Sequence, residues 1–383
     1  MIERSIFKER SKSKASNLGF QIDFADCSFN SLRRHYLILL LVHPNAKESN
    51  DAENHLWMQT SYASIAAFKQ RIAVHRAVQN NQRQQQESSG PTPKQNPHHG
   101  VVEHRKLLQR FKQFLSDEEK FWTQLILRLF RLFDLHEARA ALIVLGLLDE
   151  PDEGTTSGDA DVDGNGRNHF QFPPRDFSLD SSPKTPEERE TRISTLSKAL
   201  ICLGDIARYR EQYNESNGRP RAGHDDNVPA RRGRGRRGGA PETVARPRNY
   251  DKAQQCYEQA RFLVPHVGNP SHQLAILASY QKDSFSSIIH YYRSLCVRQP
   301  YDTASENLGT VLMKSLDLWR QKMIKEKEKV GTNDAELPIK IRVDLLRERI
   351  VILHALWRVG MEKGIEKCAC IFCAMALETY TIF

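Results

Sequence analysis

The sequence predicts an all-α protein, built as an array of antiparallel helical hairpins with long disordered insertions. Apolar residues recur at helical spacing in several separate segments of the chain. No segment alternates Val or Ile with polar residues in the way that indicates a β-sheet. Apolar residues make up 39% of the chain, and the polar runs between the helical segments bury too little apolar surface to fold alone. These observations favour helices separated by linkers over one continuous core.

The balance of charges and cysteines limits the class of protein. The chain carries a formal net charge of +9, which suggests an anionic partner: nucleic acid, a phosphoprotein or a membrane surface. Its seven cysteines have no regular spacing, which is typical of a reducing compartment. The most apolar run, residues 36–42, is far shorter than the roughly 20 residues that span a membrane, so we expect a buried helix or strand there. No secretory signal is visible at the N-terminus, and a soluble intracellular protein is expected.

The first half of the chain holds helices on either side of a polar linker. Residues 1–50 form an N-terminal extension of uncertain structure. Leu56 and Ile65 belong to the apolar face of an amphipathic helix that begins the ordered body. A polar insertion at about 79–100 follows it. Helical spacing then returns over residues 101–150, as one long helix or as two close ones followed by a third.

An acidic insertion at about 150–184 contains the string DVDGNG, which resembles the start of a calcium-binding loop. In an EF-hand loop the twelfth position carries a bidentate Glu. Counting from Asp161, the twelfth position here is Phe172. No amphipathic helices flank the string closely. We therefore interpret the insertion as a solvated acidic loop rather than a metal site.

Residues 185–213 predict a helix with a defined start and an unusual end. Thr185 is a candidate N-cap, and Pro186 suits the first turn. Near the end, the string GDIARYR at 204–210 places a basic and aromatic cluster beside an apolar face, which a plain core helix does not require. A segment rich in Gly, Pro and Arg follows at about 214–248 and cannot fold alone.

The next segment carries the pattern of a tetratricopeptide repeat. Residues 250–265 match the second helix of such a repeat, and residues 284–300 repeat the ending about one period later. A generic helical hairpin is the alternative. The partner helix of the first repeat must then be 185–213, with a lengthened turn between the two helices, because loop entropy rises slowly with length. The matching positions are Ala253, Tyr257, Ala260 and Pro265, then Leu274 and Ala275 in the helix between, then Tyr291, Ser294 and Pro300.

The C-terminal part adds helices but no catalytic or metal-binding pattern. Two helical segments, 303–329 and 336–360, complete an ordered domain that we expect to span 51–360. The tail 361–383 is atypical. It contains CACIFC, which offers three thiols without a clear fourth ligand, whereas zinc sites usually pair two short knuckles. We expect no metal, no cofactor and no enzymatic activity.

These pieces together carry a resemblance to a known family. The strings LGDIARYR, GNPSHQLAILA and DSFSSIIHYYRSL resemble the telomerase-regulator and nonsense-mediated-decay adaptor family, that is, the ever-shorter-telomeres protein and its SMG relatives. The match runs discontinuously over about 56–312 and is specific over 202–300. It implies a 14-3-3-like fold with tetratricopeptide hairpins, whose concave groove binds phosphoserine or phosphothreonine peptides. Relatives continue into further helices, so we expect a fungal-type chain that is truncated at its C-terminus.

The first functional expectation is a non-catalytic adaptor of nonsense-mediated mRNA decay, nuclear and cytoplasmic, with no membrane partner. It would dock a phosphorylated decay factor, notably the RNA helicase. GDIARY is also similar to the GD-x-x-RY motif of 14-3-3 proteins, whose Arg and Tyr contact phosphate, and the matching residues are Arg208 and Tyr209. A planar guanidinium suits phosphate oxygens. The resemblance implies Lys69 as a second cation, two turns after Tyr62, where one member of the family has Lys.

Each of these residues also has a purely structural interpretation. Arg208 could instead form a buried salt bridge to Asp205 or to an acid of an early helix. Tyr209 could pack in the core, and Lys69 could be solvated. Arg293, in the string HYYRSL, could line the groove or cap a hairpin.

The second functional expectation is a telomerase-associated regulatory factor that binds RNA or single-stranded telomeric DNA. The segment 219–248 holds nine Arg against three acids, and Arg-Gly segments bind RNA without sequence preference. No aromatic residue interleaves the Arg-Gly run, so base stacking would have to come from elsewhere. A solvated loop or a nuclear import signal is the alternative. The arginines concerned are Arg231, Arg232, Arg234, Arg236 and Arg237.

Overall fold

The regular elements of the described chain are all helices. Strand-like pairing there is confined to an isolated bridge between Val267 and Gln299, so the all-α prediction is confirmed. Most of the insertions expected at 150–184 and 214–248, and the tail 361–383, lie outside the described residues. The computed structural model describes residues 22–88, 98–149, 170, 172–173, 183, 185–214, 248–326 and 338–360.

The chain divides into two compact units, which are described separately. The long helix α5 (His98–Leu132) contributes residues to both. The ordered domain expected at 51–360 therefore contains parts of two units, and the extension 1–50 contributes a helix to the first. Unit 1 comprises residues 1–121, 131–134 and 151–183, and unit 2 comprises residues 122–130, 135–150 and 184–383.

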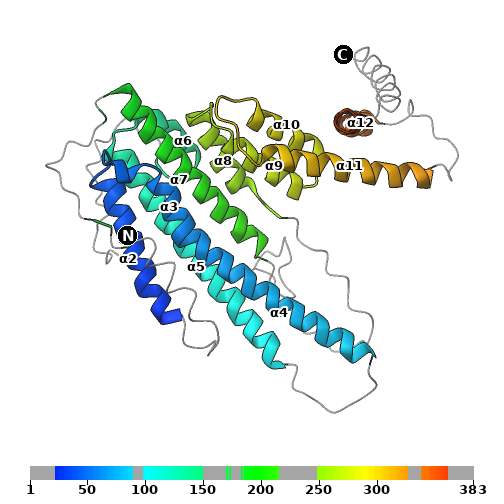
Figure 1. The fold of residues 1–383 in the computed structure, drawn as a ribbon, viewed down its shortest axis with the longest axis horizontal. Helices are drawn as coiled ribbons and strands as arrows, with labels where there is room; N and C mark the ends of the chain where they lie inside the picture. Colours follow the sequence, from blue (N-terminus) through cyan, green and yellow to red (C-terminus); the bar gives the residue numbers. More distant parts are fainter. Residues whose placement is uncertain are drawn as a thin grey trace, which may run out of the picture. The chain divides into compact units, whose positions relative to one another are not determined.

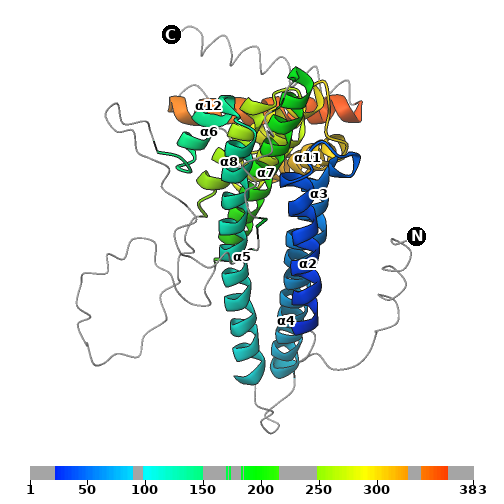
Figure 2. The ribbon, with the colours of Figure 1, turned by 90° about the vertical axis from the view of Figure 1, so that its left-hand side faces the viewer.

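Unit 1 consists of helices whose apolar faces pack together. The apolar run 36–42 falls at the end of the first described helix, where Leu37 and Leu40 are buried, so the helix alternative for this run is confirmed. Helices α4 and α5 extend side by side in both views (Figure 1, Figure 2), with the Phe68 and Phe111 rings 5.0 Å apart. The elements are α2 (Ile22–Leu41), η1 (Lys47–Ser49), α3 (Ala52–Leu56), the π-helical η2 (Trp57–Ser61), α4 (Tyr62–Ser88) and the first part of α5.

Helix α4 is longer than its apolar pattern indicates. It continues to Ser88, past the linker start expected at residue 79. The added turns are rich in Gln, which has high helix propensity. Apolar spacing therefore places the end of this helix too early, because it follows the buried face and not the propensity of the backbone.

A buried ion pair joins α2 to α5 inside unit 1. Arg33 Nη2 donates to both carboxylate oxygens of Glu118, at 2.6 and 2.8 Å, and the Ser61 hydroxyl donates to the same carboxylate at 2.5 Å. The Arg33 guanidinium also lies 3.9 Å from the centre of the Phe121 ring. That ring stacks in turn on buried Phe172. The position at which a calcium loop needs Glu is thus part of an aromatic core.

Unit 2 begins its helical array at the predicted N-cap. The Thr185 hydroxyl accepts a hydrogen bond from the Glu188 backbone N–H at 3.2 Å, and the Thr185 N–H donates to the Glu188 side chain at 3.3 Å. This reciprocal capping box, with Pro186 in the first turn, fixes the start of α7. The elements are the end of α5, η3 (His136–Ala138), α6 (Arg139–Val144), α7 (Pro186–Gln212), α8 (Asp251–Leu263), α9 (Asn269–Tyr280), α10 (Ser284–Leu295), α11 (Ala304–Glu326) and α12 (Ile339–Val359).

Helices α7 and α8 form a hairpin across the insertion, as the repeat pattern predicts. The Ser197 hydroxyl donates to the Ala260 carbonyl at 3.0 Å, and the Tyr257 hydroxyl donates to Asp205 at 2.5 Å. Gly204 permits this close approach, since a Cβ atom there would lie 2.6 Å from Tyr257 Cε1. The repeat positions on α8 therefore pack against α7, as their residue types indicate.

The two ends of the insertion between α7 and α8 are adjacent. The Asn249 backbone N–H donates to Glu211 Oε1 at 2.9 Å. The chain leaves the hairpin and returns to it at one place, which agrees with the lengthened turn that the repeat pattern predicts.

Helices α9 to α12 continue the array around a shared apolar core. The repeat positions Ala275 and Tyr291 are buried in it, together with Leu308 of α11 and Val351 of α12. The small repeat residues are also buried, as the pattern predicts. Ala253, Ala260, Ala275 and Ser294 are each at most 1% exposed.

Candidate ligand-binding site

Arg208 lies near the end of α7, and 6% of it is exposed. Its Nη2 donates to Asp205 Oδ1 at 2.8 Å, and its Nη1 donates to Gln273 Oε1 on α9 at 3.2 Å. Its buried Nε has no hydrogen-bond partner among the described residues. Burial by itself would lower the pKa of Arg208, but the Asp205 carboxylate and nearby tyrosines raise it, so the group stays charged. The salt bridge to Asp205, the structural alternative for this residue, is present.

Aromatic side chains and a histidine surround this ion pair. Tyr209 is 7% exposed, and the Arg208 guanidinium lies 5.2 Å from the centre of its ring. His272 on α9 is buried against Tyr301, with ring centres 4.3 Å apart. Burial, and then the charge of Arg208, lower the pKa of His272 to about 4. His272 is therefore neutral near pH 7, and Arg208 supplies the positive charge of the cluster. An incoming phosphate has to compete with Asp205 for that charge.

Lys69 and Tyr62 lie on α4 in unit 1. Lys69 is half-buried. Tyr62 packs near Trp57, with ring centres 6.2 Å apart. Of the predicted phosphate-binding residues, unit 2 holds Arg208 and Tyr209 together on α7, and unit 1 holds Lys69.

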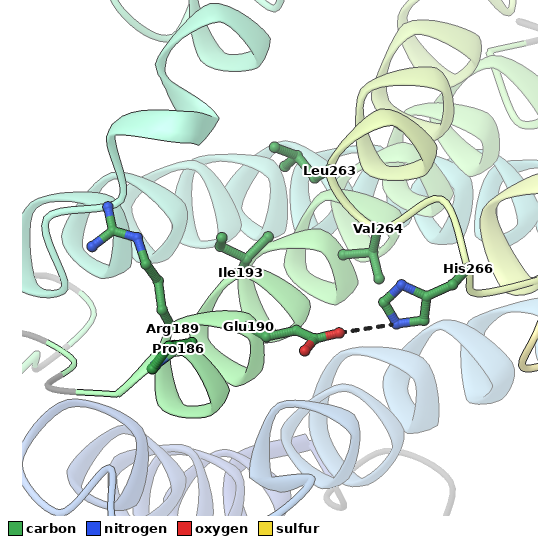
Figure 3. A pocket seen from close by; sticks show the side chains of 7 residues that line it. All are labelled: Pro186, Arg189, Glu190, Ile193, Leu263, Val264 and His266. Atoms are coloured by element: carbon green, nitrogen blue, oxygen red, sulfur yellow. Dashed lines mark ion pairs between the residues drawn. The ribbon is translucent and has the colours of Figure 1, made fainter.

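A pocket of about 300 Å³ opens between the start of α7 and the end of α8 (Figure 3). Arg189 on its rim forms an ion pair with Glu137, and this hydrogen bond lowers the pKa of the carboxyl. On the other side, His266 Nε2 lies 3.6 Å from Glu190 Oε1. The pocket therefore has apolar side chains at its centre and paired charges around them. No sequence pattern indicated this pocket, because two distant segments of the chain build it. The lining residues are Pro186, Arg189, Glu190, Ile193, Leu263, Val264 and His266.

A second cationic cluster involves α8 and α10. Arg261 and Arg293 are close enough that, after burial, Arg293 contributes to lowering the pKa of Arg261. The Arg261 guanidinium lies 5.0 Å from the centre of the Phe262 ring, and 64% of Phe262 is exposed. His290 lies one turn before Arg293, and burial followed by the two arginines lowers its pKa to about 4. The sequence analysis left the role of Arg293 open and did not single out Arg261 or Phe262. The only sequence signal for these two residues was that a basic and an aromatic residue stand next to each other.

The other chemical motifs fall in the core or outside the described residues. Cys202 and Cys256 are buried thiols, and burial raises the pKa of Cys256 to about 12, as suits small core residues. Among the described residues, no group of His, Cys, Asp and Glu could hold a metal ion. No described helix is long and apolar enough to cross a membrane. The predicted nucleic-acid-binding residues Arg231, Arg232, Arg234, Arg236 and Arg237, and the CACIFC string, lie outside the described residues.

Two models from one protein family match the chain. The model described as telomerase activating protein Est1 matches residues 51–214. The model described as the Est1 DNA/RNA binding domain matches residues 253–358. The matched segments extend from the beginning of α3 to the last turn of α12 and together cover most of the chain.

Curated relatives agree with this match. The chain is 27% identical over 300 residues to the nonsense-mediated mRNA decay factor SMG7 of Arabidopsis thaliana, covering 78% of this chain and 22% of that protein. It is 44% identical over 118 residues to SMG7 of Danio rerio, covering 31% of this chain and 7% of the relative. It is 31% identical over 142 residues to telomerase-binding protein EST1A of Danio rerio, covering 36% of this chain and 7% of that protein. The chain thus spans about a fifth or less of the length of these relatives.

A solved structure shows the same fold. The crystal structure of Est1 and Cdc13 contains a chain that matches 92% of this one and 55% of its own length, with a TM-score of 0.51 and 14% identity. That identity is low, so this likeness concerns the helical array alone. With the family models and the relatives, it shows that the chain belongs to the Est1 and SMG7 family of telomerase-associated and nonsense-mediated-decay proteins.

Proposed function

We propose that the chain is a non-catalytic adaptor that docks a phosphorylated segment of a partner protein. The observation that carries this proposal is Arg208, a charged guanidinium that Asp205 and Gln273 hold in place beside Tyr209. The relatives named as decay factors support nonsense-mediated mRNA decay as the process. The partner that we propose is a phosphorylated decay factor, such as the RNA helicase of that process. Such an adaptor would act in the nucleus and the cytoplasm.

The chemistry of phosphate capture follows from the hydrogen bonds of Arg208. A phosphate oxygen would replace the neutral Gln273 amide oxygen as the acceptor at Arg208 Nη1. The phosphate carries negative charge, so the exchange adds a Coulomb attraction to the guanidinium that the neutral amide does not supply. Tyr209 would add a hydroxyl donor, and the family resemblance implies Lys69 as a second cation. Because 6% of Arg208 is exposed, we expect the Gln273 side chain to move when the ligand binds.

The test compares a labelled phosphoserine peptide library with its unphosphorylated counterpart by fluorescence anisotropy. Lys69→Glu should weaken phosphopeptide binding by about tenfold or more, since it replaces an attraction with a repulsion. Arg71→Glu, an equal charge change at an exposed position of the same helix, is the matched control and should have little effect. Arg208→Lys keeps the charge but loses the planar fork, and should also weaken binding. Equal binding of both libraries to the wild type would refute the adaptor proposal.

A second candidate is binding of RNA or single-stranded telomeric DNA by a telomerase-associated factor. It is favoured by the description of the family model that matches 253–358 and by the nine arginines of 219–248. Replacing residues 219–247 by a neutral linker should weaken binding of a labelled oligonucleotide and flatten its salt dependence, because fewer phosphate counterions are released. Unchanged oligonucleotide affinity would count against this candidate.

A further inference from the structure

We propose that the pocket between the start of α7 and the end of α8 is a second docking site. It takes one apolar side chain of a partner peptide that carries a lysine or arginine next to that side chain. Every residue that lines the pocket belongs to unit 2. The site neither includes Arg208 nor requires a phosphate group, so it goes beyond the proposed function.

The first argument is the size of the pocket and the apolar side chains at its centre. In Figure 3 the side chains of Ile193, Leu263 and Val264 lie between Arg189 on one side and His266 on the other. Ile193 and Leu263 are half-buried, so part of their apolar surface still contacts water, and covering that surface favours binding. The volume of about 300 Å³ is at the lower limit for ligand pockets. It suits one large apolar side chain better than a whole cofactor.

The second argument is the charge at the rim of the pocket. The Arg189 guanidinium is already neutralised by Glu137, to which its Nε and Nη2 donate at 2.5 and 2.9 Å. The Glu190 carboxylate faces His266 at 3.6 Å, which is too long for a hydrogen bond, and 65% of the Glu190 side chain is exposed. An imidazole offsets a carboxylate only when it is protonated. With histidine neutral, two carboxylates outnumber one guanidinium, so the rim attracts a cation.

The same charges decide between classes of ligand. A nucleic acid or a phosphorylated segment would bring negative charge against the exposed Glu190 carboxylate, and like charges repel. A basic residue beside an apolar one satisfies both parts of the site. The apolar side chain fills the pocket, and the cation reaches Glu190 at the rim. A short basic and apolar segment of a partner protein is therefore the occupant that fits.

The experiment titrates the full chain, with labelled Ile, Leu and Val methyl groups, with short peptides of the sequence Gly-Ser-Lys-Xaa-Lys-Ser-Gly. Xaa is Phe, Leu or Ser. Methyl NMR spectra give the dissociation constant and locate the peptide, because Ile193, Leu263 and Val264 carry methyl groups in the pocket. The Phe and Leu peptides should shift these signals. The Ser peptide should bind about tenfold more weakly, because it buries no apolar side chain there.

Reversing the charge of the rim tests the selection of a cation. Glu190→Lys should weaken binding of the Lys-Phe-Lys peptide about tenfold and strengthen binding of a Glu-Phe-Glu peptide. Glu187→Lys is the matched control. It makes the same change at an exposed position near the same helix start, outside the pocket lining, and should bind within about twofold of the wild type. Both variants place a cation near the N-terminus of α7, so an effect through the helix dipole would be common to them.

The apolar centre has a test of its own. Leu263→Ser should reduce the preference for Phe over Ser at the variable position of the peptide, because it removes apolar surface from the pocket. Thermal unfolding checks that each variant is folded. If Leu263→Ser unfolds, the reversal of charge at the exposed residue Glu190 still decides the proposal.

Three outcomes would overturn the proposal. If the methyl signals of Ile193, Leu263 and Val264 stay unchanged, the peptide does not enter the pocket. If Glu190→Lys and Glu187→Lys bind the Lys-Phe-Lys peptide equally, the rim does not select a cation. If these signals shift with protein concentration in the absence of peptide, a second copy of the chain occupies the pocket. The phosphoserine libraries test phosphate binding separately, so either proposal can fail alone.

Discussion

Arg208 and Asp205 depend on each other in the folded chain, because each is buried and each would be an unmatched charge without its partner. Removing one member of a buried ion pair leaves the other charge without compensation, and this is usually far more destabilising than removing both. The Asp205 carboxylate also accepts the Tyr257 hydroxyl, so it connects the charge of α7 to the packing of α8. Any test of Arg208 in binding therefore has to separate binding from folding.

Asp205→Asn should lower the free energy of unfolding by about 3 to 5 kcal/mol, because it leaves the Arg208 charge buried and unpaired. Urea unfolding followed by circular dichroism measures this. The matched control is Asp317→Asn, which breaks the exposed ion pair with Arg320 at 3.4 Å. This variant should lower the free energy of unfolding by about 1 kcal/mol or less. Similar losses in the two variants would show that the buried pair adds nothing to stability.

His272 should make stability depend on acidity. Its pKa is lowered to about 4 in the folded chain, whereas an unfolded histidine titrates near 6.5. Between these values the unfolded state binds more protons, so stability falls as pH decreases from about 6.5 toward 4. The loss approaches about 1.4 kcal/mol per pH unit for one group.

Urea unfolding at pH 7.5 and pH 5.5 checks this, with His272→Gln as the comparison. The Gln side chain can still accept the hydrogen bond that Asn307 donates to His272 at 2.9 Å, but it does not titrate. The variant should lose less stability than the wild type over this interval. Parallel losses would mean that other groups, such as His290, dominate the pH dependence.

At the scale of elements, the spacing between helices is set by small residues at the points of closest approach. Gly204 on α7 lies against Tyr257 and Cys256 of α8. The fully buried Tyr257 ring fills the space that a side chain at Gly204 would need. The α7–α8 hairpin is therefore more sensitive to added volume at this point than its exposed turns are.

Gly204→Ala should destabilise the chain by about 1 to 3 kcal/mol, because the added methyl group overlaps a ring that cannot easily move. Gly309→Ala is the control, also inside a helix. There the Cβ atom would lie 3.0 Å from the flexible end of the Arg358 side chain, which can move aside. The gain in helix propensity, about 1 kcal/mol, should therefore outweigh this contact and stabilise the variant. Thermal unfolding compares the two, and a stabilised Gly204→Ala variant would contradict this account of the hairpin.

The helices could be predicted from the sequence where a buried face requires apolar or small residues at helical spacing. Ala253, Tyr257 and Ala260 recur at the spacing of a buried helix face, and the capping box at Thr185 is local in sequence, so both were readable. The end of α4 was not, because its last turns follow propensity without a buried face. Nor was the environment of Arg208, because Gln273 reaches it from a helix that lies far along the chain.

At the scale of the whole molecule, the array tolerates the long insertion between α7 and α8 because the two ends of that insertion meet. Glu211 of α7 and Asn249, just before α8, are joined by a hydrogen bond of 2.9 Å, although residues 215–247 lie between them in the sequence. The resemblance to a known family singled out Arg208, Tyr209 and Lys69 from the sequence, whereas the pocket beside α7 required coordinates, because two distant segments of the chain build it.

Replacing residues 215–247 by a linker of about eight residues should preserve the fold and raise stability by about 1 kcal/mol, because closing a shorter loop loses less entropy. Circular dichroism and thermal unfolding measure this. A fall in helix content beyond the removed residues would show that the insertion helps to hold α7 against α8.

The Arg33–Glu118 pair has a practical consequence for how the chain is trimmed. A fragment that begins where the family match begins, at residue 51, lacks α2 and with it the guanidinium that neutralises a carboxylate buried in α5. Such a fragment would carry an orphaned anion in its interior, and poor yield or aggregation in the expression host would then reflect the chosen boundary and not the protein.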